Sequence, residues 1–319
     1  MPAVISHYLL AERVIPKITK NLPELNRSAF LLGANGPDIF FAHRIMPWQK
    51  QRSLAWISHI MHNGRPDVLL NYLTEYAQAN HDTAALSYAL GFVTHYAFDS
   101  AAHPYIVNYA ETAAEGRSVH LPLIGRANEQ IADGIKLSSV YHNKLEGCLD
   151  TIFLMKEKRI PVYRFRIETT CPNDMDCYIA AAKALRSYIT DHHICTDVPT
   201  EEIVRAQTDW RRCLKVINDS FSVKKKLITG GERLLHIPPV VSVFLRNIDM
   251  DYSEDYVNFA HREWTSPADG TKHQDSFFDL ADKAEEKSII LIEKLLGGNP
   301  LSSVDCRDSF SGKPIIQEK

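Results

Sequence analysis

The amino-acid sequence predicts an all-α fold in which the helices form a bundle. Apolar residues recur at helical spacing through most of the 319 residues, and the alternation typical of strands is scarce. Turns rich in glycine, proline and aspartate separate the helical stretches. A bundle of this kind has inward-facing positions at which side chains can hold metal ions.

The first half of the chain is predicted to alternate helices with one rigid turn. Apolar positions indicate a helix over residues 7–20, and a second short helix precedes the segment LLGANGPDIFF. Gly36 and Pro37 in that segment cannot comfortably continue a helix, so Asp38 is expected to emerge from a turn. Further helices are predicted over residues 48–62, 66–79, 83–103 and about 126–157.

The second half is predicted to be a helical extension. Residues 159–168 (RIPVYRFRIE) are the main strand candidate and a natural boundary. We therefore expect a bundle over residues 1–165 that carries the functional side chains, and a helical C-terminal extension packed on it over residues 166–319. Within the extension, helices are predicted over residues 174–190, 200–220, 253–263 and 276–296, and the tail from Gly297 is expected to be loosely structured.

Composition, charge and the N-terminal sequence argue against several classes of protein. A net charge of −3 and a pI near 6.5 give no overall attraction to phosphate backbones, which argues against general nucleic-acid binding. The six cysteines form no CxxC pair, as expected for reduced thiols in the cytosol. The N-terminus lacks a secretory pattern, and no stretch approaches eighteen apolar residues. We therefore predict a cytoplasmic protein with no transmembrane segment.

The predicted long apolar helix carries an unusual set of polar residues. Asp82 is its expected N-cap and Pro104 its expected end, and between them THYAFDSAAHP places His95, Asp99 and His103 four residues apart. Two imidazoles and a carboxylate on one helical stripe are ligands that zinc accepts. The alternative is that these histidines are buried and satisfy their nitrogens with backbone carbonyls.

The next predicted helix repeats this spacing. In YHNKLEGCLD, His142, Glu146 and Asp150 again lie four residues apart on one face. Together with His7, Asp38 and a histidine of the segment ISHIMH, the N-terminal half offers enough nitrogen and oxygen ligands for two or three divalent ions.

Five fragments in this order resemble the zinc-dependent phospholipases C, a helical superfamily shared with the single-strand-specific zinc nucleases. The fragments are Ser6-His7, GANGPD, ISHIMH, GFVTHYAFDSAAHP and HNKLEGCLD, and the resemblance covers roughly residues 1–160.

The resemblance implies the zinc ligands. One ion would be held by Asp38, a histidine of ISHIMH, His95 and Asp99; a second by His103, His142 and Glu146; and a third by His7, Asp99 and the N-terminus of the chain.

Three points stay open in this assignment. His62 is preferred in ISHIMH because it directly precedes the polar NGRPD turn, but His59 is an alternative. Asp150 either orients a ligand histidine or is a solvated helix residue. The number of ions is two or three, because this chain begins Met1-Pro2 whereas processed members of the family begin with a tryptophan.

The resemblance further implies a zinc-dependent phosphodiester hydrolase, most simply a phospholipase C. Clustered zinc ions make hydroxide available at neutral pH for attack on phosphorus and neutralise the phosphate oxygens. Asp38 would either orient and deprotonate the attacking water or act purely as a ligand. The expected substrate is a phospholipid or a small phosphodiester, and peripheral contact with a membrane is compatible with it.

Other functions remain open from the sequence. A single-strand nuclease shares the same superfamily. An HD-type metal phosphohydrolase would use His81 and Asp82 together with His62 and a later aspartate, whereas the phospholipase interpretation makes His81 a loop residue. A non-catalytic zinc-binding module is the third alternative. A di-iron bundle is disfavoured because the sequence contains no Glu-x-x-His pair.

Overall fold

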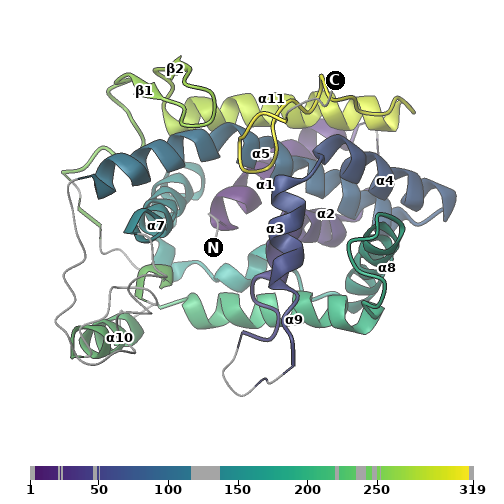
Figure 1. Ribbon diagram of the computed structural model, residues 1–319, viewed down its shortest axis with the longest axis horizontal. Coiled ribbons are helices and arrows are strands. Elements are labelled where there is room, and N and C mark those ends of the chain that lie inside the picture. The colour runs from purple at the N-terminus through teal and green to yellow at the C-terminus, as the bar shows by residue number, and fades with distance from the viewer. Residues whose placement is uncertain are drawn as a thin grey trace. The chain divides into compact units, whose positions relative to one another are not determined.

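A computed structural model describes residues 4–20, 22, 24–45, 49, 51–115, 137–219, 223–234, 242–245, 250–251 and 253–315. Helices dominate this part of the chain (Figure 1). The strands named within it are β1 (Trp264–Thr265) and β2 (Lys272–His273), which pair antiparallel with Trp264 opposite His273. The predicted all-α class is therefore confirmed.

The chain divides into two compact units. The first unit comprises Met1–Ser6, Pro104–Ile167 and Lys215–Phe277, and the second comprises His7–His103, Glu168–Leu214 and Phe278–Lys319. The predicted domain boundary at residue 165 stays a prediction. The elements in chain order are α1 (Val4–Ile18), α2 (Arg27–Gly33), η1 (Gly36–Phe40), α3 (Ala55–Asn63), α4 (Pro66–Ala79), α5 (Thr83–Ala114), α7 (Leu137–Lys158), η2 (Val162–Arg164), η3 (Ile167–Thr170), α8 (Met175–Asp191), α9 (Thr200–Ile217), α10 (Val223–Leu234), η4 (Ser242–Phe244), β1, β2 and α11 (Phe277–Leu296).

In the second unit, α2 and α5 pack with their backbones in direct contact. A Cβ atom on Gly33 would lie 2.0 Å from the carbonyl oxygen of Tyr88, and one on Gly91 would lie 2.0 Å from that of Phe30. Only glycine at both positions permits this approach. The contact fixes the end of α2, and with it the start of η1, against the N-terminal third of α5.

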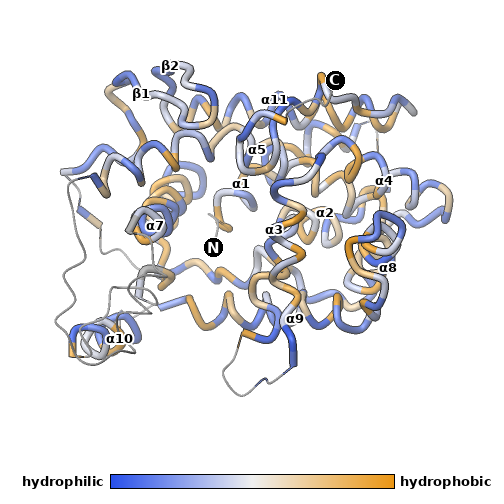
Figure 2. Tube along the Cα trace, in the orientation of Figure 1, coloured by the Kyte–Doolittle hydropathy of each residue, from blue (hydrophilic) through white to orange (hydrophobic). Residues whose placement is uncertain are grey.

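Helix α8 belongs to the same unit and packs against α4 and α2 (Figure 1). Its hydrophobic and hydrophilic residues fall on different sides of the helix (Figure 2). The apolar side is buried at Tyr178, Ala181, Leu185 and Ile189, a helical spacing. The sequence prediction of a helix over residues 174–190 is thus confirmed within one residue at each end.

In the first unit, α7 packs against η2 and η4. The C-terminal part of α5 is tied to the segment after η4, because the Tyr105 hydroxyl donates to the Tyr256 carbonyl (2.8 Å). The Tyr105 ring also meets Trp264 edge-on at 5.4 Å between centroids. None of the helices in the described part of the chain has an apolar stretch long enough to cross a lipid bilayer.

The predicted end of the long apolar helix is wrong. Helix α5 continues past Pro104 to Ala114. Proline removes one backbone donor from the helix and costs roughly 3 kcal/mol. The following turns bury Tyr105, Ile106 and Ala110, which are at most 5 % exposed, and this burial offsets the cost.

The predicted strand over residues 159–168 is also wrong. Its backbone forms 3-10 turns, in which Arg164 N–H donates to the Pro161 carbonyl (2.9 Å) and Phe165 N–H to that of Val162 (3.1 Å). The alternating pattern reflects burial of Val162 and Ile167 in these turns and in η3.

Residues 253–263 form turns instead of the predicted helix. The Asp255 carboxylate accepts from Phe259 N–H (2.8 Å) and Ala260 N–H (3.0 Å), and so competes with helical hydrogen bonds. Asn258 and His261 have positive φ values of 54° and 48°, which a right-handed helix cannot contain.

Some other predicted helices and boundaries also differ from the structure. Helix α10 was not predicted, and the helix expected over residues 48–62 begins only at Ala55. The start of the helix expected from residue 126 lies outside the described residues, which resume with α7 at Leu137. Up to residue 315, the last one described, the tail after Gly297 has no helix. It is anchored by buried Leu301, Cys306 and Phe310, so the expectation of loose structure is wrong there.

Candidate metal centre

One face of α5 carries the polar stripe predicted from the sequence. His95 is fully buried, Asp99 is 3 % exposed and His103 is partly buried. The Asp99 Oδ2 atom lies 3.1 Å from His95 Nε2 and 3.8 Å from His103 Nδ1. The four-residue spacing thus places one carboxylate between two imidazoles.

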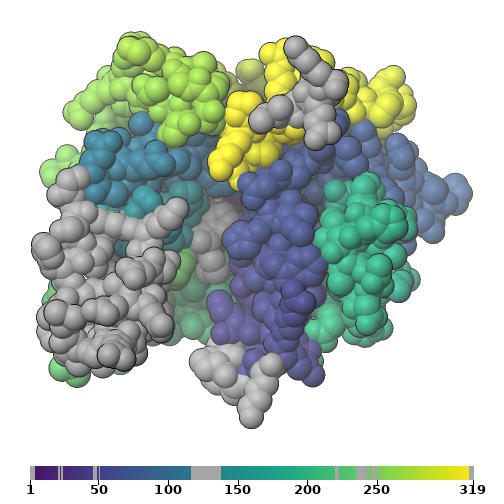
Figure 3. Space-filling model, viewed as in Figure 1, coloured from purple at the N-terminus to yellow at the C-terminus, as the bar shows by residue number. Residues whose placement is uncertain are grey.

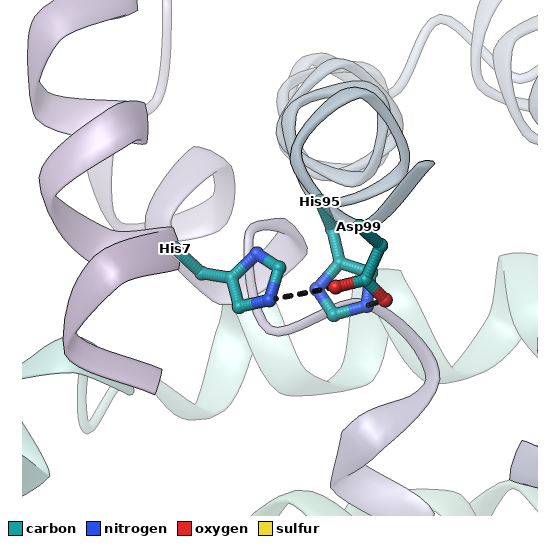
Figure 4. A group of neighbouring side chains, drawn as sticks. All are labelled: His7, His95 and Asp99. Atoms are coloured by element: carbon teal, nitrogen blue, oxygen red, sulfur yellow. Dashed lines mark ion pairs between the residues drawn. The ribbon is translucent and has the colours of Figure 1, made fainter. Parts of the chain in front are cut away.

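Helix α1 contributes His7 to this group. Its Nε2 atom lies 3.1 Å from Asp99 Oδ1, and its ring stacks on His95 with centroids 4.2 Å apart and planes 18° apart. Figure 4 shows His7 reaching from α1 toward His95 and Asp99 on α5. One ligand atom from each of these three residues lies within 4.8 Å of the others.

The turn between α2 and α3 brings Asp38 to the same place. Gly36 has a φ of +53°, and a Cβ atom there would lie 2.3 Å from His95 Cδ2. Only glycine accommodates both the backbone conformation and the imidazole. Asp38, in η1, is 1 % exposed, and its Oδ2 atom lies 4.0 Å from His95 Nε2.

The turn is fixed to α9 on both sides of Asp38. Before it, Trp210 Nε1–H donates to Asn35 Oδ1 (2.7 Å). After it, Arg44 pairs with Glu202 (2.7 Å), and the fully buried His43 lies 3.0 Å from the same carboxylate. Burial lowers the pKa of His43, although Glu202 opposes that shift.

Helix α3 adds His62 and leaves His59 outside. The Nε2 atom of His62 lies 3.2 Å from Asp38 Oδ1 and 3.6 Å from Asp99 Oδ2. His59 is exposed, and its ring meets Phe41 edge-on at 5.2 Å. Of the two histidines that the sequence left open, the structure places His62 beside the carboxylates.

Three imidazoles of the cluster have the same nitrogen bound to the backbone. His62 Nδ1 donates to the Ser58 carbonyl (2.8 Å), His95 Nδ1 to that of Ala34 (3.1 Å) and His103 Nδ1 to that of Phe310 (2.8 Å). Because a carbonyl only accepts, each neutral ring carries its proton on Nδ1 and its lone pair on Nε2. Metal-binding histidines are oriented in this way.

The buried polar atoms of the cluster are not all satisfied by the protein. His7 Nδ1, His95 Nε2, Asp38 Oδ1 and Asp99 Oδ2 are buried and accept or donate no hydrogen bond. Burial of such groups costs roughly 1–3 kcal/mol each. Nitrogen and carboxylate oxygen atoms are also the donors that zinc takes. The residues present therefore fit a zinc ion, and the carbonyl alternative accounts for only one nitrogen of each ring.

The second polar stripe lies on α7, in the first unit. His142 is partly buried, and its Nε2 atom lies 3.1 Å from Oε1 of the buried Glu146. Asp150 is fully buried and accepts from both the backbone N–H (2.8 Å) and the hydroxyl (2.9 Å) of Ser6. The solvated alternative for Asp150 is therefore wrong, because its carboxylate is enclosed and bonded to the start of α1.

A family model described as zinc dependent phospholipase C matches residues 6–195. The chain belongs to this family. Comparison with curated proteins and with solved structures gave no match. The matched region of this zinc-dependent phospholipase C family contains all eight predicted ligands, namely His7, Asp38, His62, His95, Asp99, His103, His142 and Glu146. Phe310, which accepts from His103, lies outside it.

Charge within the cluster agrees with a cation site in this family. Burial alone would raise the pKa of Asp99, but His103, His95 and His7 outweigh it and hold that pKa well below its ordinary value. Burial would lower the pKa of His62, but Asp38 and Asp99 outweigh it and raise that pKa. Asp99 is thus an anion in a buried setting surrounded by imidazoles.

The positions of His81 and Asp82 do not support the alternative of an HD-type metal phosphohydrolase. His81 is exposed, with a φ of 49°, in the turn between α4 and α5. The Asp82 carboxylate accepts from Ala85 N–H (2.9 Å) and so caps α5.

Sequence reasoning missed the groups that orient the imidazoles. The carbonyls of Ala34, Ser58 and Phe310 carry no side-chain signal, because any residue can supply a carbonyl. The one available signal was Gly36, whose missing side chain makes room for His95.

Proposed function

We propose that this protein hydrolyses phosphodiesters with zinc, and that its substrate is a phospholipid or a small phosphodiester. The observation that carries the proposal is the buried group of Asp38, His62, His95 and Asp99, in which both imidazoles are oriented by backbone carbonyls. Family membership supports the same chemistry.

The first proposed zinc ligands come from segments that meet in the second unit. Asp38, His62, His95 and Asp99 would hold one ion, and His7 with Asp99 would hold another. His103, His142 and Glu146 remain the predicted ligands of a further ion, and two to three ions are proposed in all. Bound zinc would supply the Lewis acidity that makes water a nucleophile at neutral pH and would neutralise the phosphate oxygens.

Asp38 has the proposed catalytic role. Its carboxylate is held on a rigid turn and can accept a proton or a hydrogen bond from water at Oδ1, one of the unpaired atoms of the cluster. A role purely as ligand is the alternative, and the variant Asp38→Asn separates the two. If Asp38 is a general base, this variant should keep its zinc content while its turnover falls by roughly 100-fold or more. If Asp38 is purely a ligand, the variant should lose zinc.

The test combines metal analysis with turnover. Purified protein would be assayed for zinc and for hydrolysis of bis(p-nitrophenyl) phosphate and of phosphatidylcholine vesicles, before and after chelation. We expect zinc at two or more per chain, loss of turnover on chelation and recovery on adding zinc. A zinc-free protein that does not respond to added zinc would refute the proposal.

Two alternative functions are tested when single-stranded DNA is added to the same assay as a third substrate. Hydrolysis of single-stranded DNA in preference to both other substrates would favour the nuclease alternative, and stoichiometric zinc without any turnover would favour a binding module. A cytoplasmic location and peripheral contact with membranes stay predictions.

A further inference from the structure

We infer that the C-terminal loop (residues 307–315) is a structural part of the metal centre, in which Phe310 positions His103, His62 and His95, so that zinc binding and docking of this loop stabilise each other. The inference rests on the zinc-binding part of the proposed function. It extends the centre beyond residues 6–195, the region that the family model matches.

The loop has a defined backbone. Asp308 and Pro314 form an antiparallel bridge. Ser309 N–H donates to the Lys313 carbonyl (2.8 Å), and Ile315 N–H donates to that of Arg307 (2.9 Å). Phe310 and Ser311 therefore lie at the tip of a closed loop.

Contacts to α5 and α3 hold this tip. The Tyr96 hydroxyl on α5 donates to the Asp308 carbonyl (3.0 Å), and the Ser311 hydroxyl donates to the His62 carbonyl on α3 (3.4 Å). The space-filling view shows part of the chain near its C-terminus, in yellow, against the blue surface of α3 (Figure 3). The loop is thus bound to two of the helices that present candidate ligands, α3 and α5.

Phe310 contacts three histidines of the cluster in two ways. Its fully buried ring lies 5.9 Å from the rings of both His62 and His95. Its carbonyl accepts from His103 Nδ1 at 2.8 Å. The ring limits the rotation of two imidazoles, and the carbonyl leaves the lone pair of the third on Nε2.

The first test uses the mutual effect of zinc binding and loop docking. If docking of the loop raises the affinity for zinc, zinc must favour docking by the same factor. Hydrogen exchange of the wild-type protein would be followed with and without zinc at the amides of Ser309 and Ile315. We expect zinc to slow their exchange more than it slows exchange at His193 and Ile194, which are hydrogen-bonded at the end of α8.

Substitution of Phe310 gives the second test. Phe310→Ala is expected to weaken zinc binding by about ten-fold, the lower end of the range for residues that orient metal ligands. Phe277→Ala is the control, because it removes another fully buried ring, one that meets Phe153 edge-on at 5.7 Å. We expect Phe277→Ala to stay within about two-fold of wild type, and Phe310→Leu to recover most of the affinity.

A spectroscopic readout separates positioning from a general loss of stability. Long-range proton–nitrogen spectra of the metal-free protein should show His103 with its proton on Nδ1. In Phe310→Ala the backbone carbonyl is retained, but loss of the buried ring should undock the loop and withdraw that carbonyl from His103. This histidine should then become a mixture of tautomers, while Phe277→Ala should leave it unchanged. Assignment would use the His103→Gln variant.

The outcomes are distinct. Zinc affinity of folded Phe310→Ala within about two-fold of wild type would overturn the inference. So would equal zinc responses of the loop and of the end of α8. If Phe310→Ala does not fold, Phe310→Leu and the exchange experiment decide. A wild-type protein that binds no zinc would instead refute the proposed function itself.

Discussion

The polar stripes on α5 and α7 have the same spacing but different surroundings. On α5, Asp99 lies within 4 Å of histidines from three elements, α1, α3 and α5 itself. On α7, His142 lies beside Glu146 of the same helix, and Asp150 accepts from Ser6. A four-residue spacing aligns side chains on one helix, and on α5 other segments bring further candidate ligands to the stripe.

The largest effect is expected at the centre of the α5 group. Asp99→Asn keeps the shape of the side chain but removes the charge that His7, His62 and His95 share. We expect zinc affinity in the second unit to fall by at least about 100-fold, because the substitution removes a ligand and not merely its support. Equilibrium dialysis would measure it, and unchanged zinc content would show that Asp99 is not a ligand.

A smaller effect is expected where the backbone supports the α5 group. Gly36→Ala should destabilise the metal-free protein by about 3 kcal/mol, through its positive φ and its clash with His95. Gly298→Ala is the matched control, because Gly298 has a φ of +73° but nothing within 4 Å of the position that a Cβ atom would take. It should cost only about 1 kcal/mol. Urea unfolding gives both values, and equal costs would remove His95 from the explanation.

The α7 stripe should respond differently. Ser6→Ala removes one of the two hydrogen bonds that Asp150 accepts from Ser6, and we expect a loss of about 1–2 kcal/mol in stability. Zinc content should stay at the wild-type value. Loss of zinc in this variant would mean that Asp150 supports the metal centre and would weaken the contrast between the two helices.

A pH effect is expected where the Asp38 turn is fixed to α9. Burial holds the pKa of His43 below its usual 6.5, so on acidification the unfolded chain takes up this proton before the folded chain does. Stability of the metal-free protein should therefore fall as the pH drops below about 6.5. His43→Asn should show a shallower dependence in urea unfolding at several pH values, and an identical dependence would exclude His43 as its source.

The smallest effect is expected at His59. His59→Ala should leave zinc affinity within about two-fold of wild type, because the side chain is exposed, whereas His62→Ala should lose a ligand. Calorimetric titration with zinc compares the two variants directly. The reverse result would mean that the register of α3 differs from the structure.

The sequence predicted the α5 stripe well because helical spacing is local. It left His59 and His62 open, because both lie on α3 and only the packing of that helix decides which one meets Asp38. It placed the helix end at Pro104 because burial of Tyr105 and Ile106 is a tertiary effect. The role of Phe310 could not be predicted for the same reason, since its contact with His103 spans 207 positions in the chain.

The reciprocal contact of Gly33 and Gly91 also limits which substitutions the protein can tolerate. In a saturation library selected for folding, both positions should retain glycine almost alone, since even one methyl group meets a carbonyl of the opposite helix. Neighbouring Leu32 and Leu90 bury side chains and should exchange with other aliphatic residues. The pattern of tolerated substitutions along α2 and α5 would then show at which positions the two backbones are in direct contact.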